Sequence, residues 1–109
     1  MRQISALELD RYLHSRADTP GTIGLLDVRE TWEHALCSIS GSVLMPMSRI
    51  GDHLNELDPE RDWVVICHHG VRSLQVGFYL ERAGFQSIAN LRGGIDAWAI
   101  DVDPEMPRY

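Results

Sequence analysis

The residues best suited to chemistry stand together in one short segment, Cys67-His68-His69-Gly70-Val71-Arg72-Ser73. An apolar run, residues 63–66, precedes this segment, and apolar residues at helical spacing follow it from 73 to 83. The segment is therefore expected to form a loop between the carboxyl end of a buried strand and the first turn of a helix. Ligands of parallel sheets bind at that end of the strands.

A loop in this position can hold an anion. The free backbone N–H groups of a helix's first turn point out of its N-terminus, and a short turn before the helix can aim further N–H groups at the same point. Gly70 permits a positive φ angle or a close backbone approach. Arg72 adds a fixed positive charge, to which His68 and His69 could add. A thiolate at Cys67 would be stabilised there, so Cys67 is the candidate nucleophile.

Such a thiolate could attack phosphorus, as in cysteine phosphatases, or sulfur, as in sulfurtransferases. A phosphatase loop has the spacing C-x5-R and surrounds a tetrahedral phosphoryl group. Here four residues separate Cys67 from Arg72, which gives C-x4-R. A ring of amides that is one residue shorter suits a terminal sulfur atom on the cysteine better than a whole phosphate.

The sequence leaves the roles of several side chains open. Asp27 and Arg29 end another apolar run, and a structural ion pair or a loop-bracing hydrogen bond is favoured over direct contact with a substrate. Arg72 could face an anionic substrate group, the solvent or an acidic neighbour. For His68 and His69, the backbone amides are expected to matter more than the imidazoles, because sulfur transfer to a thiolate needs no general base.

The elements that must position the loop alternate along the chain. Apolar runs predict strands at 23–28, 43–45, 63–66 and 85–91, and helical spacing predicts helices at 5–14, 30–36, 48–57, 73–83 and 93–98. Ser5 and Glu8 have the form of a capping box, and the cluster at 18–21 breaks the first helical pattern. Alternating strands and helices indicate an α/β fold with a mostly parallel sheet.

Composition excludes several classes of protein. The 109 residues fit one domain. A net charge of −6, with ten arginines and no lysine, argues against binding to nucleic acid or to an anionic membrane surface. No apolar run reaches the roughly 20 residues of a membrane span, and no secretory signal pattern opens the chain. Cys37 and Cys67 do not form a C-x-x-C pair, so we expect a cytoplasmic protein with free thiols, no metal and no cofactor.

The loop resembles the active loop of the rhodanese family, whose single-domain members commonly show C-x-x-G-x-R-S. Three further segments resemble family motifs in the same order. Residues 25–30 resemble L-[LI]-D-V-R, Glu33-His34 with Ile39 and Gly41-Ser42 resemble E-[YFH]-x-x-G-H-I-x-G-[AS], and residues 90–98 resemble V-x-x-L-x-G-G-[IM]-x-x-W. The resemblance covers about residues 4–98. Cys37 and Ser38 stand where the family often has Gly and His, which affects a turn and not the nucleophile.

This resemblance implies a rhodanese-like, three-layer α/β domain over residues 1–109, with a mostly parallel sheet of about five strands flanked by helices. It also implies a thiosulfate sulfurtransferase-like enzyme. Cys67 would take sulfane sulfur from a donor such as thiosulfate, residues 68–73 would hold the persulfide, and a thiol or cyanide would collect the sulfur.

Other readings stay open beside this one. Residues 102–109 resemble the endings of rhodanese modules attached to sulfur-carrier-activating enzymes, so a sulfur-carrier protein is a possible acceptor. The alternatives are a cysteine-dependent phosphatase or arsenate reductase of related fold, and a non-catalytic module that binds a partner. The shorter loop counts against the first alternative, and the cysteine counts against the second.

Overall fold

The computed structural model describes residues 1–15 and 23–109, so the predicted helix break at 18–21 lies outside the described residues. The described chain forms a five-stranded sheet in the order β1-β5-β4-β2-β3, and all neighbouring strands are parallel. The strands are β1 Arg2–Ile4, β2 Ile23–Asp27, β3 Val43–Leu44, β4 Asp62–Ile66 and β5 Ser87–Leu91. The helices are α1 Ala6–Ser15, α2 Thr31–Leu36, α3 Val71–Arg82 and α4 Gly94–Asp101.

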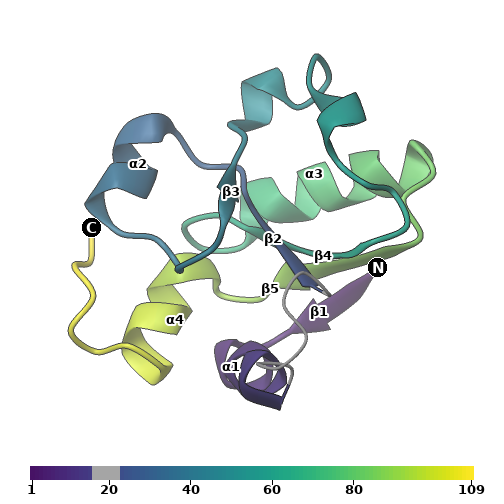
Figure 1. Ribbon diagram of the computed structural model, residues 1–109. Helices are drawn as coiled ribbons and strands as arrows, with labels where there is room; N and C mark the ends of the chain where they lie inside the picture. Colours follow the sequence, from purple (N-terminus) through teal and green to yellow (C-terminus); the bar gives the residue numbers. More distant parts are fainter. Residues whose placement is uncertain (16–22) are drawn as a thin grey trace.

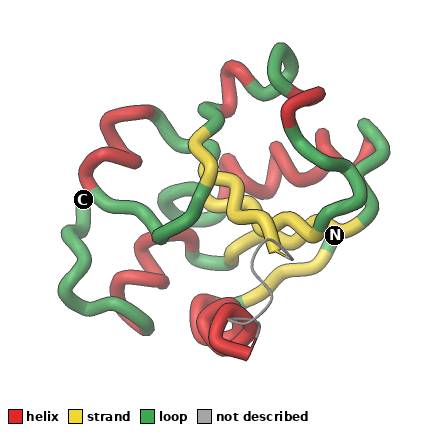
Figure 2. Tube along the Cα trace, viewed as in Figure 1, coloured by secondary structure: helices red, strands yellow, loops and turns green. Residues whose placement is uncertain are grey.

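The sheet lies between two layers of helix, with α3 on one side and α1 and α4 on the other (Figure 1). Alternation along β2 and β4 explains this arrangement, because successive side chains of a strand point to opposite faces. Leu26 and Val65 pack with residues of α3, whereas Leu25 and Val64 pack with residues of α1 and α4. Strands occupy the centre of the molecule in Figure 2. The predicted three-layer α/β fold is confirmed.

Local signals predicted some helix ends well. The capping box of α1 is present, since the Glu8 N–H donates to Ser5 Oγ at 3.1 Å and the Ser5 N–H donates to Glu8 Oε1 at 2.9 Å. Helix α3 begins at Val71, two residues before the predicted start, with Gly70 as its N-cap.

Two predictions of secondary structure were wrong or incomplete. The helix predicted at 48–57 is replaced by two 3-10 turns, Met47–Arg49 and Leu54–Glu56. Gly51 and Asp52 have poor helix propensity, and two short turns still bury Ile50 and Leu57 in the core. Strand β1 was missed because its three residues are too few to show a period. It is recognisable only by its pairing with β5.

Because all strands are parallel, their carboxyl ends meet at one edge of the sheet. Strands β2, β4 and β5 therefore bring Asp27, Cys67 and the residues after Leu91 to the same edge. Within residues 1–15 and 23–109, no helix has the length and apolar character needed to cross a bilayer.

Candidate active site

Cys67 follows the last residue of β4 and lies buried just before α3, with 1% of its surface exposed. The backbone N–H of Gly70 donates to Cys67 Sγ at 3.0 Å. Gly70 has φ 100°, in the left-handed region that favours glycine, and this conformation turns the chain from the loop into the first turn of α3. The loop thus curls around Cys67 at the N-terminus of α3, whose first-turn N–H groups lack acceptors within the helix.

A buried side-chain network contacts Cys67, the candidate nucleophile, from the α3 side. Ser73 Oγ lies 3.2 Å from Cys67 Sγ and also donates to Asn90 Oδ1. The Asn90 amide has a fixed orientation, because its Nδ2 donates to the backbone oxygen of Gly70 at 3.2 Å and to Gln3 Oε1 at 2.9 Å. Asn90 was given no role in the sequence analysis. Its only signal there is a polar residue inside an apolar strand.

Helix α4 holds the other side of the loop through main-chain contacts. The N–H of Ile95 donates to the carbonyl oxygen of Cys67 at 2.8 Å, and the N–H of Asp96 donates to that of His68 at 3.1 Å. These carbonyls therefore point toward α4 and satisfy two of the orphan donors of its first turn. Gly93 and Gly94, with φ 81° and 63°, make the turn that permits this approach.

Asp27 and Arg29 form a fully buried ion pair, with Arg29 Nη2 2.7 Å from Asp27 Oδ2. The Arg29 guanidinium also donates to the backbone oxygen of Cys37 at 2.6 Å and to the hydroxyl of Tyr109 at 2.9 Å. Burial opposes the charge, but the hydrogen bonds with Asp27 and Tyr109 outweigh it and raise the pKa of Arg29. All these partners belong to the chain itself, so the pair has a structural role: it holds the end of β2, Cys37 and Tyr109 together beside the site. Cys37 is buried beside it.

Arg72 faces an acidic neighbour, Glu33, in a bidentate ion pair with N–O distances of 2.8 and 2.9 Å. Glu33 is buried, and it also accepts hydrogen bonds from the Tyr109 hydroxyl at 2.7 Å and from the Glu30 N–H at 2.9 Å. The hydrogen bonds from Arg72, followed by those from Tyr109 and Glu30, outweigh burial and lower the pKa of Glu33 to about 2. The hydrogen bonds with Glu33 likewise raise the pKa of Arg72 against the effect of burial.

The end of the chain, predicted only to be irregular, reaches this site and lies beside α2 (Figure 1). The Tyr109 ring stacks on His68 with centroids 3.9 Å apart, and it makes a T-shaped contact with Trp32 with centroids 5.6 Å apart. Burial, together with the charge of His69, lowers the pKa of His68. Burial is also the main cause that raises the pKa of Tyr109 to about 12. The sequence analysis gave Tyr109 no individual role.

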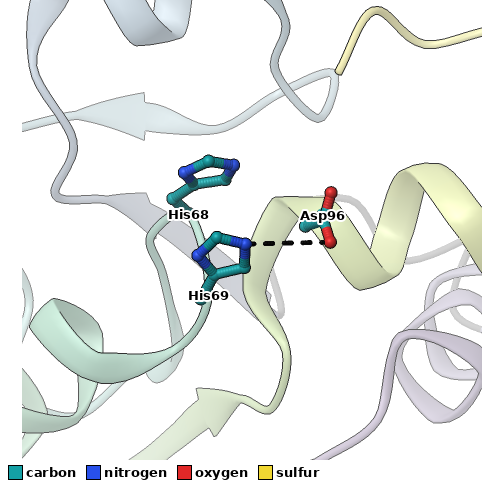
Figure 3. A group of neighbouring side chains, drawn as sticks. All are labelled: His68, His69 and Asp96. Carbon is teal, nitrogen blue, oxygen red and sulfur yellow. Dashed lines mark ion pairs between the residues drawn. The ribbon is translucent and has the colours of Figure 1, made fainter. Parts of the chain in front are cut away.

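His68, His69 and Asp96 are the described side chains whose ligand atoms come close enough to suggest a metal, all within 4.8 Å of one another (Figure 3). Two features oppose such a site. The two imidazoles are stacked 22° from parallel, so their in-plane lone pairs do not converge on one point. Asp96 is already paired with Arg108 at 3.0 Å and lies 3.8 Å from His69. These residues are not preorganised for a metal.

The chain matches the family model described as Rhodanese-like domain over residues 9–101. The Arabidopsis thaliana protein named Rhodanese-like/PpiC domain-containing protein 12, chloroplastic, is 38% identical over 104 residues, which are 89% of this chain and 35% of that protein. A protein of Allochromatium vinosum named Sulfurtransferase is 40% identical over 83 residues, which are 76% of this chain and 77% of that protein. The chain thus spans only about a third of the plant relative.

Among solved structures, the chain is similar to a rhodanese-like domain protein from Staphylococcus aureus. The TM-score is 0.80 at 30% identity, and the match covers 100% of this chain and 99% of the other. The fold similarity therefore extends over the whole of both chains.

Proposed function

Because the chain belongs to the rhodanese-like domain family, we propose that it is a sulfurtransferase in which Cys67 carries the transferred sulfur as a persulfide. The observation that carries this proposal is the Gly70 N–H, which donates to Cys67 Sγ at the N-terminus of α3. Backbone donors in this position stabilise negative charge on sulfur, both on the thiolate and on the outer atom of a persulfide. The relative named Sulfurtransferase supports the same chemistry.

The reaction has two steps. The Cys67 thiolate attacks the outer sulfur of a donor such as thiosulfate, a new S–S bond forms, and sulfite leaves with the electron pair of the broken bond. Residues 68–73 then hold the persulfide, whose terminal sulfur lies toward the amides at the start of α3. A thiol or cyanide attacks that sulfur and restores the Cys67 thiolate, so ping-pong kinetics are expected.

Asp27, Arg29, Asn90 and Ser73 are proposed to position the loop rather than to react. Asp27 and Arg29 are buried and satisfied by partners within the chain, and Asn90 links the loop to β5 and β1. Ser73 is the described hydroxyl closest to the nucleophile in this network, at 3.2 Å. Neither imidazole of His68 and His69 has a step assigned to it.

The setting of the reaction is part of the same proposal. Residues 1–109 act as one domain in the cytoplasm, which is supported by two buried, unpaired cysteines of the kind that persist in a reducing compartment. A sulfur-carrier protein is proposed as a second kind of acceptor. This is supported by the resemblance of residues 102–109 to the ends of rhodanese modules in sulfur-carrier-activating enzymes.

The proposal is tested by incubating the protein with thiosulfate and measuring its intact mass. Wild type and Cys37→Ser should each gain one sulfur atom, which cyanide removes, whereas Cys67→Ser should gain none. A Cys67→Ser protein that still gains cyanide-labile sulfur would exclude Cys67 as the carrier. Hydrolysis of an aryl phosphate without any gain of sulfur would favour the phosphatase alternative. A protein that hydrolyses no aryl phosphate and gains no sulfur from any small sulfane donor would favour the partner-binding module.

A further inference from the structure

Arg72 is the one arginine of the active-site loop, and its charge is already neutralised. Two of its nitrogens donate to the two carboxylate oxygens of Glu33 in a fork geometry. Arg72 is also close enough to the nucleophile for the charge of Cys67 to contribute to its raised pKa. The cation nearest in sequence to the reacting sulfur therefore belongs to a pair with no net charge.

Glu33 is not free to release Arg72. Its side chain is 5% exposed and accepts four hydrogen bonds, two from Arg72, one from the Tyr109 hydroxyl and one from the Glu30 N–H. Tyr109 is itself held by Arg29, which is anchored on Asp27. A substrate anion that competed for Arg72 would leave a buried carboxylate without its counter-ion, which is strongly unfavourable.

This pairing has consequences for the sulfur donor. Thiosulfate is a dianion, with one charge on the outer sulfur and one on the sulfonate group. The loop amides can stabilise the charge on the sulfur, but the sulfonate needs a second source of positive charge, which the paired Arg72 does not supply. The residue that precedes each member of the pair is apolar and exposed instead, since Trp32 is 63% and Val71 66% exposed.

We propose that Glu33, by neutralising Arg72, selects sulfane-sulfur donors that carry a single negative charge over dianionic thiosulfate. This rests on the proposed transfer through Cys67. The donors are persulfides, R–S–S⁻, and organic thiosulfonates, R–SO₂–S⁻. In each case Cys67 Sγ forms a bond to the outer sulfur and the donor's S–S bond breaks. The electron pair leaves on a thiolate or a sulfinate, so charge and atoms balance without a further reactant.

Methanethiosulfonate and thiosulfate form a matched pair of probes, because a methyl group replaces one charged oxygen. We expect wild type to favour methanethiosulfonate by roughly tenfold or more in kcat/KM, and Glu33→Gln to lower this ratio by roughly tenfold, the effect of gaining one unpaired cation near the donor. The ratio is the readout because losses common to both donors cancel. Glu33→Asp, which keeps the charge, and Glu60→Gln, which removes an exposed carboxylate before β4, should keep the wild-type preference.

Other outcomes separate this inference from the proposed function. If neither donor places sulfur on Cys67 of folded protein, the proposed function is wrong and the inference falls with it. If sulfur is transferred but wild type prefers thiosulfate, or if Glu33→Gln leaves the ratio unchanged, only the inference is overturned.

Salt dependence in wild type tests the inference without a variant, should Glu33→Gln fail to fold. With no net cation at the loop, kcat/KM for thiosulfate should stay level or rise with ionic strength, because the chain as a whole is negative. A steep fall with added salt would show that an unpaired cation attracts the dianion, and would contradict the inference.

Discussion

Gly94 lies against the active-site loop so closely that a Cβ at position 94 would stand 2.3 Å from the carbonyl oxygen of His68. The same Cβ would stand 2.5 Å from the carbonyl oxygen of Cys67. This approach is what lets the first amides of α4 bind those two carbonyls. The conformation of the loop that begins at Cys67 therefore depends on the absence of a side chain at position 94, which is 27 positions further along the sequence.

We expect Gly94→Ala to abolish sulfur transfer and to lower the free energy of unfolding by roughly 3 kcal/mol, because a backbone clash adds to the strain of a positive φ. Gly84→Ala is the matched control. Its φ is 100°, but nothing lies within 4 Å of the added Cβ. Gly84→Ala should lower the free energy of unfolding by only about 1 kcal/mol, the strain of an alanine in the left-handed region. Urea unfolding and the mass assay measure both effects, and equal losses in the two variants would contradict the packing argument.

Ser73→Ala should weaken both the fold and the reaction. It leaves Asn90 Oδ1 buried without its donor, at a cost of about 1–3 kcal/mol, and it removes the hydroxyl beside Cys67 Sγ. The rate of persulfide formation is expected to fall by roughly tenfold, because Asn90, which holds the Gly70 carbonyl, loses its own support and the loop is positioned less firmly around Cys67. Ser48→Ala, at an exposed serine, should change neither quantity. A Ser73→Ala enzyme with wild-type rates would show that Ser73 has only a structural role.

The Glu33–Arg72 pair should stabilise the protein in a pH-dependent way. The pKa of Glu33 is lowered in the folded state from 4.5 to about 2, so the folded carboxylate binds its proton more weakly than the unfolded one. The contribution of the ionised Glu33 to the free energy of unfolding is therefore complete above pH 4.5 and is lost as the pH falls toward 2. The difference in unfolding free energy between wild type and Glu33→Gln should therefore shrink across this range. Denaturant titrations at several pH values measure it, and a constant difference would contradict the assignment.

Replacing Tyr109 should change the titration of His68. Burial is the main cause that lowers the pKa of His68, and the stacked Tyr109 ring covers its imidazole. Tyr109→Ala should raise the pKa of His68 toward its ordinary value of 6.5. Tyr109→Phe keeps the ring and should keep the pKa low, although it loses the hydrogen bonds to Arg29 and Glu33. Histidine proton shifts measured by NMR against pH distinguish the variants. The same pKa in both would show that the ring does not shield His68.

The sequence alone determined the parts of the site that depend on neighbours along the chain. A strand that ends just before Cys67, a glycine at position 70 and a helix after it are all local patterns, and together they predicted the loop. The alternation of strands and helices is also a pattern along the chain, and it predicted the parallel sheet. Strand β1 was missed because it is too short to show a period, and the helix predicted at 48–57 was wrong because two 3-10 turns bury apolar residues that happen to have helical spacing.

The tertiary structure decided which distant residues support the loop. Glu33 meets Arg72 across 39 positions and Tyr109 across 76, and Asn90 bonds Gly70 across 20. Such contacts depend on the order of strands in the sheet and on the path of the tail, which no local propensity encodes. The sequence could thus single out Cys67 as the candidate nucleophile, whereas only the folded chain shows that the loop's arginine is neutralised by a buried carboxylate.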